Sequence, residues 1–539
     1  MNMNIRDHYF RNVDEGGNLI VEAIEQLERD VDSLENRMNT AETNISDTNE
    51  RITNIATRLD LHELENEQAF YIVNEKINKL FSGDYTFVKW HGAVGDGITD
   101  DTAAIQAALD SGKTYIIFDK GTYLVSSAGY GKACLLCPSN RHLIGLGATI
   151  LNNTSSSISI VNKSPALEDP TAGGVYSANT NIIISNLNFR GTNNNSLGCL
   201  GFAHCDNVKI FNCNFTDLGG WHFIELNSTH DAIISGCTFK NYDGPNLTEM
   251  IQLDMATHAD VFPFFGPYDN TPCQNIIIEN CFFSGPLSYY NNSDNYFKLV
   301  PAAIGSHNAS ATPGENNQYV TIRGCYFINL QTCVKFAALR NSIIEGNQAI
   351  AVRHFFNAND MESESTAYFA GIKITNNRLI TSPLSAEVVT AGQSTRTRCI
   401  GFGGINCEIS GNDIYGWSGY AINVTGVGHV ISNNSIMNCG RKAIYVYGND
   451  NNIFSGNKAI GNCTYNMDGD ADIVVVPDGN SSPANNNLIT GNVVDTMRLT
   501  NPSSTKTAVT NNNILTALTV SAGDACIVHN NLVNGSWSA

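Results

Sequence analysis

An eight-residue pattern recurs through most of this chain and strongly limits the folds it can adopt. The pattern is apolar-x-apolar-x-(Asn/Gly)-(Cys/Asn)-x-apolar, with clear copies VKIFNCNF (208–215), AIISGCTF (232–239), IIIENCFF (276–283) and VTIRGCYF (320–327). Its sixth residue forms a series of Cys and then Asn, namely Cys213, Cys237, Cys281, Cys325, Asn347, Asn377, Asn412, Asn434, Asn457, Asn492, Asn512 and Asn531. Gaps of 19 to 24 residues are the commonest, three gaps of 30 to 35 indicate inserted loops, and two gaps of 44 indicate two coils each.

A repeat of this length predicts a solenoid, because a coil of about 22 residues buries its apolar face only by stacking on its neighbours. Equivalent side chains then lie one strand spacing apart, about 4.8 Å. Asn suits such a column because its amide bonds to the backbone and to the next Asn, and it tolerates the left-handed conformation. Buried Cys replaces it as a small apolar residue. We therefore expect a mainly β fold, a parallel β-helix, rather than a propeller with its longer period or a jelly roll.

The N-terminal segment has a different pattern. Apolar residues step by three and four from Ile20 through Leu27, Leu34 and Ile45 to Leu59, about six heptads. This spacing predicts an α-helical coiled-coil stalk, although a single amphipathic helix gives a similar pattern. We expect the helix to end near Ser82-Gly83.

The stretch Gly92–Gly112, GAVGDGITDDTAAIQAALDSG, connects the two parts. It predicts a short helix with Thr99 or Asp100 as N-cap and Gly112 just beyond its end. The motif resembles the opening of the pectate-lyase-like superfamily of right-handed parallel β-helices, found in phage tailspikes and polysaccharide-degrading enzymes. The expected domains are an N-terminal tail-attachment segment and stalk (1–83), the opening coils (84–180) and the main right-handed β-helix (181–539). We attribute Asp96, Asp100 and Asp101 to turns and capping rather than to a metal site.

Composition restricts the partners. A net charge of −20 argues against nucleic acid, because phosphate recognition needs a basic surface. The sequence contains no apolar run of about 20 residues and no hydrophobic signal region, so we expect neither membrane insertion nor export by a leader. Fifteen Cys without a leader predict thiols made in a reducing cytosol, and we interpret the lone pair Cys134 and Cys137 as core residues.

A cluster of polar residues lies along one of the predicted strands in several coils. If Ile224, Ile251 and Val334 point inward, Glu225, Gln252 and Lys335 form one outward column, with Asn227 and Asp254 beside it. Strict alternation would turn His222 and Glu249 inward unless the strand begins after them. Small residues at Gly201 and Ala203 are the expected floor. The cluster predicts a glycan groove, with Trp221 as a sugar-stacking platform, although single outward carboxylates are often only solvated charges.

A second resemblance covers EMIQLD (249–254), YDNTPCQNI (268–276) and IGSH (304–307). These segments are similar to a pattern in a subset of pectate-lyase-like proteins of phages and bacteria. The resemblance implies that Glu249, Gln252, Asp254, Asp269 and His307 belong to the site. A turn function for Asp269 and a structural hydrogen bond for His307 stay open. The aromatic loop between the first two segments is expected to fold over the groove.

Together these features favour a phage tailspike depolymerase that hydrolyses a host-surface polysaccharide. Glu225, Glu249, Asp254 and Asp269 are the candidate catalytic residues, and Trp221, His222, Gln252, His307 and Lys335 are the candidate glycan-binding residues. No metal or cofactor is expected. Resemblance to tailspikes implies a homotrimer, attachment to the phage tail or baseplate through the N-terminus, and a location in the virion tail after synthesis in the host cytoplasm and release by lysis. The alternatives are a non-catalytic receptor-binding fibre and a polysaccharide lyase.

Overall fold

The computed structural model describes Val31 and most of residues 83–537. The residues outside this description are 1–30, 32–82, 127–131, 156, 192–197, 243–247, 258–264, 286–301, 311–314, 359–368, 381–397, 418, 448–449, 465–469, 477–485, 501–504, 522–524 and 538–539. The chain divides into two compact units at Gly83, and Asp84–Ala539 is the larger. Apart from Val31, the predicted coiled coil lies outside the described residues and stays a prediction, as do the domain limits. The described residues contain no helix long and apolar enough to cross a bilayer.

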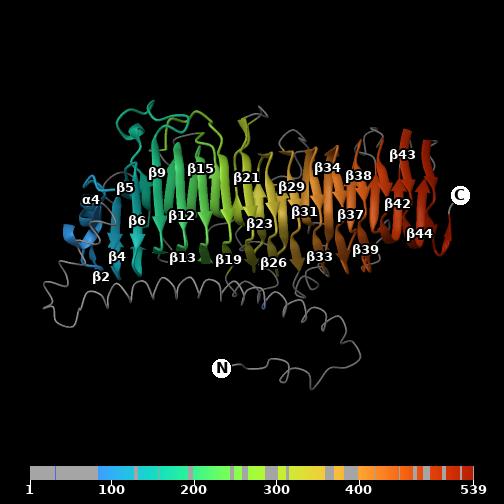
Figure 1. The fold of residues 1–539 in the computed structure, drawn as a ribbon, viewed down its shortest axis with the longest axis horizontal. Coiled ribbons are helices and arrows are strands. Elements are labelled where there is room, and N and C mark those ends of the chain that lie inside the picture. Colours follow the sequence, from blue (N-terminus) through green and yellow to red (C-terminus); the bar gives the residue numbers. More distant parts are fainter. Residues whose placement is uncertain are drawn as a thin grey trace, which may run out of the picture. The chain divides into compact units, whose positions relative to one another are not determined.

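The larger unit is a parallel β-helix, whose coils Figure 1 shows side by side along the molecule. Most coils contribute one strand to each of three ladders. The ladder that carries the site, here called sheet A, contains β5 (Ala133–Cys137), β8 (Ile158–Asn162), β11 (Gly198–Ala203), β14 (His222–Asn227), β17 (Glu249–Asp254), β20 (Ala302–Gly305), β23 (Thr332–Phe336), β27 (His354–Ala358), β31 (Arg398–Ile405), β34 (Tyr420–Val427), β37 (Ile444–Tyr447) and β40 (Ile473–Val476).

The other two ladders complete each turn. Sheet B contains β1 (Tyr85–Phe87), β3 (Tyr115–Phe118), β6 (Arg141–Gly145), β9 (Asn179–Ser185), β12 (Cys205–Phe211), β15 (His230–Ser235), β18 (Gln274–Glu279), β21 (Gln318–Arg323), β24 (Leu339–Arg340), β25 (Ile343–Glu345), β28 (Phe369–Ala370), β29 (Lys373–Thr375), β32 (Glu408–Ser410), β35 (Val430–Ser432), β38 (Ile453–Ser455), β41 (Leu488–Thr490), β43 (Thr505–Thr510) and β45 (Ala525–His529). Sheet C contains β2 (Asp96–Asp100), β4 (Gly121–Val125), β7 (Ala148–Asn152), β10 (Asn188–Arg190), β13 (Asn214–Leu218), β16 (Thr238–Tyr242), β19 (Phe282–Ser284), β22 (Tyr326–Ile328), β26 (Gln348–Ile350), β30 (Arg378–Ile380), β33 (Asp413–Tyr415), β36 (Ser435–Met437), β39 (Lys458–Ile460), β42 (Val493–Thr500), β44 (Asn513–Ser521), β46 (Leu532–Val533) and β47 (Ser536–Trp537).

The predicted column of Asn residues is confirmed as a hydrogen-bonded ladder at the corner between sheets B and C. In a representative step, Oδ1 of Asn434 accepts from the backbone N–H of Asn412 at 3.0 Å and from its Nδ2 at 3.0 Å, while Nδ2 of Asn412 also donates to the carbonyl of Ile374 at 2.8 Å. Each buried amide therefore satisfies backbone groups of two coils, which is what a tight corner without its own strand pairing needs.

Two details of the predicted coil are wrong. The left-handed residue is the one before the ladder Asn, as at Asn376 and Asn433, or a Gly such as Gly411. The two 44-residue gaps are single coils with long insertions, because β15 pairs directly with β18 and β18 with β21. The repeat pattern could not distinguish a long loop from an unrecognised coil.

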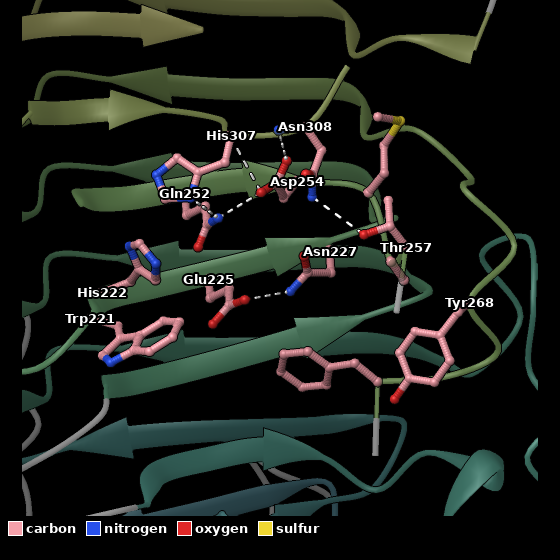
Figure 2. Close-up of a pocket in the computed structure, with 13 residues that line it drawn as sticks. Trp221, His222, Glu225, Asn227, Gln252, Asp254, Thr257, Tyr268, His307 and Asn308 are labelled. Carbon is pink, nitrogen blue, oxygen red and sulfur yellow. Dashed lines mark hydrogen bonds between the residues drawn. The ribbon is translucent and has the colours of Figure 1, made fainter. Parts of the chain in front are cut away.

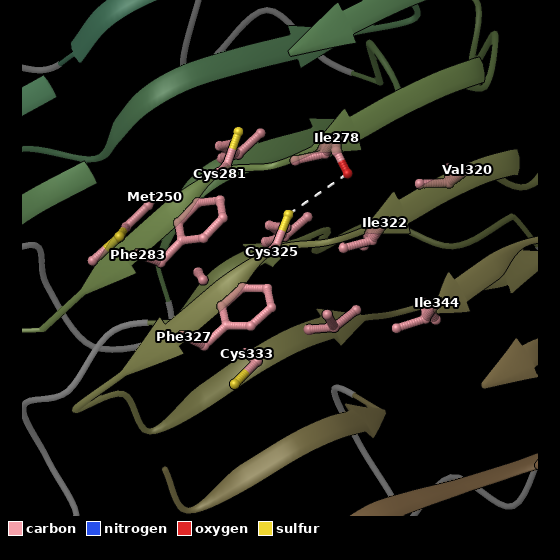
Figure 3. Close-up of a cluster of buried hydrophobic side chains, with 14 of the residues drawn as sticks. Met250, Ile278, Cys281, Phe283, Val320, Ile322, Cys325, Phe327, Cys333 and Ile344 are labelled. Carbon is pink, nitrogen blue, oxygen red and sulfur yellow. Dashed lines mark hydrogen bonds between the residues drawn. The ribbon is translucent and has the colours of Figure 1, made fainter. Parts of the chain in front are cut away.

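The core is a stack of identical side chains along the solenoid axis. Phe189, Phe215, Phe239, Phe283 and Phe327 have nearly parallel rings, with successive centroids 4.8 to 5.1 Å apart. Figure 3 shows two of these rings beside the buried column cysteines. All fourteen cysteines that the structure describes are free thiols. The interpretation of the column Cys as core residues is therefore confirmed for the described residues.

The opening motif forms the strand β2 followed by a helix. Its helix is α4 (Thr102–Leu109), and its N-cap is Asp101, not Thr99 or Asp100 as predicted. Asp100 Oδ1 accepts from the Thr102 N–H at 3.0 Å, and buried Asp101 accepts from the N–H groups of Val94 and Gly95 at 2.6 and 3.0 Å. These aspartates therefore hold the first coil together, as the sequence indicated.

Candidate functional site

A pocket lies on the outer face of sheet A, over β14 and β17 and beside the end of β20 (Figure 2). Its lining residues come from two adjacent coils, from the loop after β17 and from the turn after β20. They are Trp221, His222, Glu225, Asn227, Gln252, Asp254, Met255, Ala256, Thr257, Phe265, Tyr268, His307 and Asn308. The structure thus brings together six of the nine predicted site residues in one cavity.

An irregularity in the strand pattern turns the first residues of β14 and β17 outward. In β14 two consecutive residues, Phe223 and Ile224, both belong to the buried core, and so do Met250 and Ile251 in β17. Simple alternation therefore stops at this point, because it requires one of two neighbours to face out. His222 consequently lines the pocket, whereas the sequence pattern would have placed it inside.

The outward column of sheet A contains a residue that the comparison of this chain's strand segments did not include. Glu225 pairs with Gln252, Gln252 with Gly305, and Gly305 with Lys335. The short strand β20 separates the two predicted neighbours Gln252 and Lys335. A Cβ on Gly305 would lie 1.9 Å from the Lys335 carbonyl oxygen, so the crowded backbone at this step requires glycine.

Glu225 lies at the centre of the pocket floor and is only 5% exposed. Its Oε1 accepts a hydrogen bond of 2.8 Å from Asn227 Nδ2. Burial raises the pKa of Glu225 to about 8; the bond from Asn227 lowers it, and the charge of Asp254 raises it further. This carboxyl group therefore carries its proton at neutral pH and can donate it.

Asp254 lies on the next coil and is 3% exposed. It accepts hydrogen bonds from Gln252 Nε2 at 2.6 Å and from the backbone N–H groups of Asn308 and His307 at 3.0 and 3.4 Å. Burial raises the pKa of Asp254 to about 6, and the charge of His307 and the Asn308 amide limit the rise. At neutral pH Asp254 is therefore mostly ionised while Glu225 is mostly protonated.

Glu249 is completely buried and does not line the pocket. Its Oε2 is 2.7 Å from His307 Nε2, an ion-pair contact whose angles are not those of a hydrogen bond, and its Oε1 is 3.4 Å from Lys335 Nζ. Gln252 Nε2 lies 3.4 Å from the other ring nitrogen of His307. Glu249 and Gln252 therefore orient His307, and of these residues Gln252 and His307 line the cavity whereas Glu249 and Lys335 do not.

His222 and Trp221 form one wall of the pocket. His222 Nδ1 donates to the Glu249 carbonyl at 2.7 Å, and burial lowers the pKa of His222 to about 4. The ring is therefore neutral, and its Nε2 is left as an acceptor. Trp221, 39% exposed, offers an indole face at the edge. This arrangement suits a sugar, which has both apolar faces and hydroxyl groups.

Asp269 lies outside the pocket lining. Its carboxylate accepts from the N–H groups of Thr271 and Val175 at 3.0 and 3.3 Å. Burial raises its pKa, but the bonds from Thr271 and Val175 and the charge of His204 together outweigh burial, so that the pKa lies below the ordinary value. The structure thus places Asp269 in a turn that ties two loops together.

The aromatic loop supplies two residues that the column alignment did not include. Phe265 and Tyr268 line the pocket, and Phe265 packs into the apolar cluster of Ala133, Leu136, Ile158, Val161 and Ala203. A Cβ on Gly201 would lie 2.8 Å from the Phe265 ring. Gly201 is therefore covered rather than an open floor, and Phe265 closes the groove on this side. The loop's aromatic composition was the only signal.

Among the described residues, one group has the composition of a metal site. Asp206, His230 and Asp231 place ligand atoms within 4.8 Å of one another on sheet B, away from the pocket lining. The cluster is already satisfied internally, since His230 Nδ1 is 2.7 Å from Asp206 and Asn275 bonds to Asp231 at 3.0 Å. We assign it no cofactor.

Comparison with protein families agrees with this architecture. Residues 85–354, half of the chain, match the family described as rhamnogalacturonase A/epimerase, pectate lyase-like. Residues 361–537 match the right-handed β-helix region family. The chain belongs to the pectate-lyase-like right-handed β-helix family. The predicted hand of the solenoid and the resemblance of the opening motif are thereby confirmed at the level of the family.

Two curated proteins illustrate the range of relatives. Plasmin and fibronectin-binding protein A of Streptococcus pneumoniae is 30% identical over 303 residues, which cover 50% of this chain and 40% of that protein. The capsule K30/K69-specific depolymerase of Klebsiella phage K64-1 is 25% identical over 234 residues, 41% of this chain and 29% of the depolymerase. The chain thus spans less than half the length of either relative.

A solved structure shows the same fold. A double-mutant tailspike protein of E. coli bacteriophage HK620 aligns with a TM-score of 0.50 and 12% identity, covering 84% of this chain and 79% of the tailspike. At this identity the likeness concerns the fold alone.

Proposed function

We propose that this protein hydrolyses a cell-surface polysaccharide, with Glu225 as general acid and Asp254 as general base. One observation carries the proposal: two buried carboxyl groups on adjacent coils share a pocket, and their pKa values are separated to about 8 and about 6. Such a separation gives one group a proton and the other a charge at the same pH, which glycoside hydrolysis requires.

The reaction follows from these states. Glu225 transfers its proton to the glycosidic oxygen as the bond from that oxygen to the anomeric carbon breaks. Asp254 takes a proton from the water that attacks the anomeric carbon, so that both carboxyl groups end in the opposite protonation state and reset through solvent. The Asn308 and His307 amides hold the Asp254 carboxylate in place.

The remaining residues bind and orient the glycan. Trp221 stacks on a sugar face, the free Nε2 of His222 accepts a sugar hydroxyl, and His307 contacts the substrate from the opposite wall. Glu249 and Lys335 act through His307 and are positioning residues in this proposal. Asp269 is left outside the catalytic set because backbone amides already occupy its carboxylate.

The setting of the activity is also proposed. A tailspike depolymerase on the virion tail, trimeric and attached to the phage tail or baseplate through its N-terminus, accounts for the heptads of the N-terminal segment and for the likeness to a capsule depolymerase of a phage. Sedimentation equilibrium of the full chain tests the trimer: a monomer at micromolar concentration contradicts it.

The experiment for hydrolysis measures reducing ends released from a panel of purified capsular and exopolysaccharides. We expect release by the wild type, and a loss of about 10²-fold or more in E225Q and D254N, the range for a general acid or base. E279Q, which changes a partly buried carboxylate on sheet B away from the pocket, is the matched control and keeps full activity. Products that absorb as unsaturated uronates indicate a lyase instead.

A second candidate is a glycan-binding or adhesive protein without turnover. The relative from S. pneumoniae, by its name a plasmin and fibronectin-binding protein, favours it. Binding of a polysaccharide by the wild type, with no release of reducing ends from any member of the panel, refutes hydrolysis and supports this alternative. Immobilised plasmin and fibronectin are included as binding partners in the same assay.

A further inference from the structure

A second polar cluster lies on sheet A, towards the C-terminal end of the same outward columns. The column that begins with Glu225 and Gln252 continues through Gly305, Lys335, Asn357, Gly401 and Asn423 to Tyr445. The six steps from Gln252 to Tyr445 correspond to about 29 Å at the strand spacing. A polysaccharide laid along the sheet from the pocket passes over this cluster.

The cluster contains two buried cations and one carboxylate. Asp470 accepts from Arg441 Nε at 2.6 Å and Nη2 at 3.0 Å, and from Lys442 Nζ at 2.6 Å. Arg441 is 5% and Lys442 7% exposed. Two positive charges therefore face a single negative charge among the described residues, an excess that is costly in a buried position.

One donor of Arg441 has no partner among the described residues. Its Nη1 is buried, and no atom in the described part of the chain accepts a hydrogen bond from it, although a guanidinium normally satisfies its donors when buried. The Oδ1 atom of Asn357, between the pocket and this cluster, is likewise buried without a bond. A ligand with an acceptor group would satisfy the Arg441 donor, and a ligand with a hydroxyl group would satisfy the Asn357 acceptor.

Two tyrosines frame the cations. The rings of Tyr420 and Tyr445 stack with centroids 5.5 Å apart, and Lys442 Nζ lies 5.3 and 5.0 Å from them. Arg441 Cζ is 5.1 Å from the Tyr420 ring. Arg398, the Cα partner of Tyr420 on the preceding coil, is a third cation on this part of sheet A. Tyr445 is half-buried, so part of its side chain is reached by solvent.

We propose that Arg441 and Lys442, framed by Tyr420 and Tyr445, form a second binding site that takes an acidic substituent of the glycan held in the pocket. The group is a carboxylate, a sulfate ester or a phosphate ester, since all three accept from the fork of an arginine. The tyrosine rings contact the adjoining sugar. That the ligand is a glycan rests on the proposed function.

The test measures binding of four probes to the full-length protein: oligogalacturonate, dextran sulfate, poly(glycerol phosphate) and neutral dextran. We expect at least one charged probe to bind roughly tenfold or more tightly than neutral dextran, the size of a charged hydrogen bond. The charged probe that binds best identifies the anion. Equal binding of all four probes overturns the proposal.

Variants test whether the preference for a charged probe over neutral dextran depends on this cluster. R441Q should abolish it, R441K should keep part of it, and D470N should strengthen it, because the competing carboxylate is lost. R323Q is the matched control, since it removes the same charge from an exposed ion pair on sheet B. Should R441Q not fold, as judged by circular dichroism, R441K and D470N decide. A folded R441Q that retains the preference, or a D470N that weakens it, overturns the proposal.

The E225Q variant separates this site from the catalytic proposal. If E225Q and wild type bind the charged probe equally and neither releases reducing ends, hydrolysis is refuted and the second site stands. If the wild type hydrolyses a neutral glycan and shows no preference for charge, hydrolysis stands and the second site is refuted.

Discussion

Glu225→Gln tests the buried proton directly, without knowledge of the substrate. The pKa of Glu225 is about 8 in the folded protein and 4.5 ordinarily. Between these values the native chain holds a proton that the unfolded chain has lost, so stability falls as pH rises through this window. Ionisation of Glu225 in the unfolded chain therefore lowers the free energy of unfolding. At 1.36 kcal/mol per pKa unit, the decrease is about 1 kcal/mol at pH 5 and about 4 kcal/mol at pH 8, as orders of magnitude.

Glutamine imitates the protonated acid and cannot ionise. The E225Q variant should therefore exceed the wild type in thermal stability slightly at pH 5 and increasingly from pH 6 to pH 8. Melting curves at pH 5, 6, 7 and 8 measure the difference, with E279Q as a control on sheet B. A difference between E225Q and wild type that is constant across this range shows that Glu225 is ionised in the folded protein, and the assignment of the general acid then fails.

Three further predictions concern activity and folding. The pH dependence of kcat/KM on a hydrolysed polysaccharide should be bell-shaped, with limbs near pH 6 and 8, because activity needs ionised Asp254 and protonated Glu225; a profile flat from pH 5 to 9 contradicts this. Asn412→Ala should lower the free energy of unfolding, measured by chemical denaturation, by about 3 kcal/mol, because it leaves the Asn377 N–H and the Ile374 carbonyl without a hydrogen bond. An unchanged denaturation midpoint refutes a stabilising role for the ladder. Asp101→Ala should lower soluble yield and melting temperature while the folded fraction keeps its turnover; the reverse result would place chemistry in the opening motif.

The local patterns were sufficient for the fold but not for the path of each coil. The Asn and Cys column follows from one residue type at one position, so it could be found without coordinates, and its hydrogen bonds match the prediction. The two 44-residue gaps were misassigned because an inserted loop and an unrecognised strand have similar composition. The same limitation concealed β20 between Gln252 and Lys335.

Of the nine residues that the sequence proposed for the site, six line the pocket, but the sequence did not predict the environment of each. The sequence alone does not distinguish Glu225, Glu249 and Asp254, since each is an acidic residue on a sheet A strand. Only the folded chain distinguishes them: burial beside Asn227 protonates Glu225, amides from the next turn hold Asp254, and Glu249 is paired with His307 and Lys335 out of reach of the cavity.

The sequence by itself determined the β-helix, the ladder and the region of the groove, because periodicity along the chain is set by neighbours one coil apart. The tertiary structure decided the protonation states, the closure of the groove by Phe265 and the alignment of the Arg441 cluster with the pocket. These depend on burial and on contacts between residues from distant coils, and a pKa or an unmet hydrogen bond exists only once those coils are stacked.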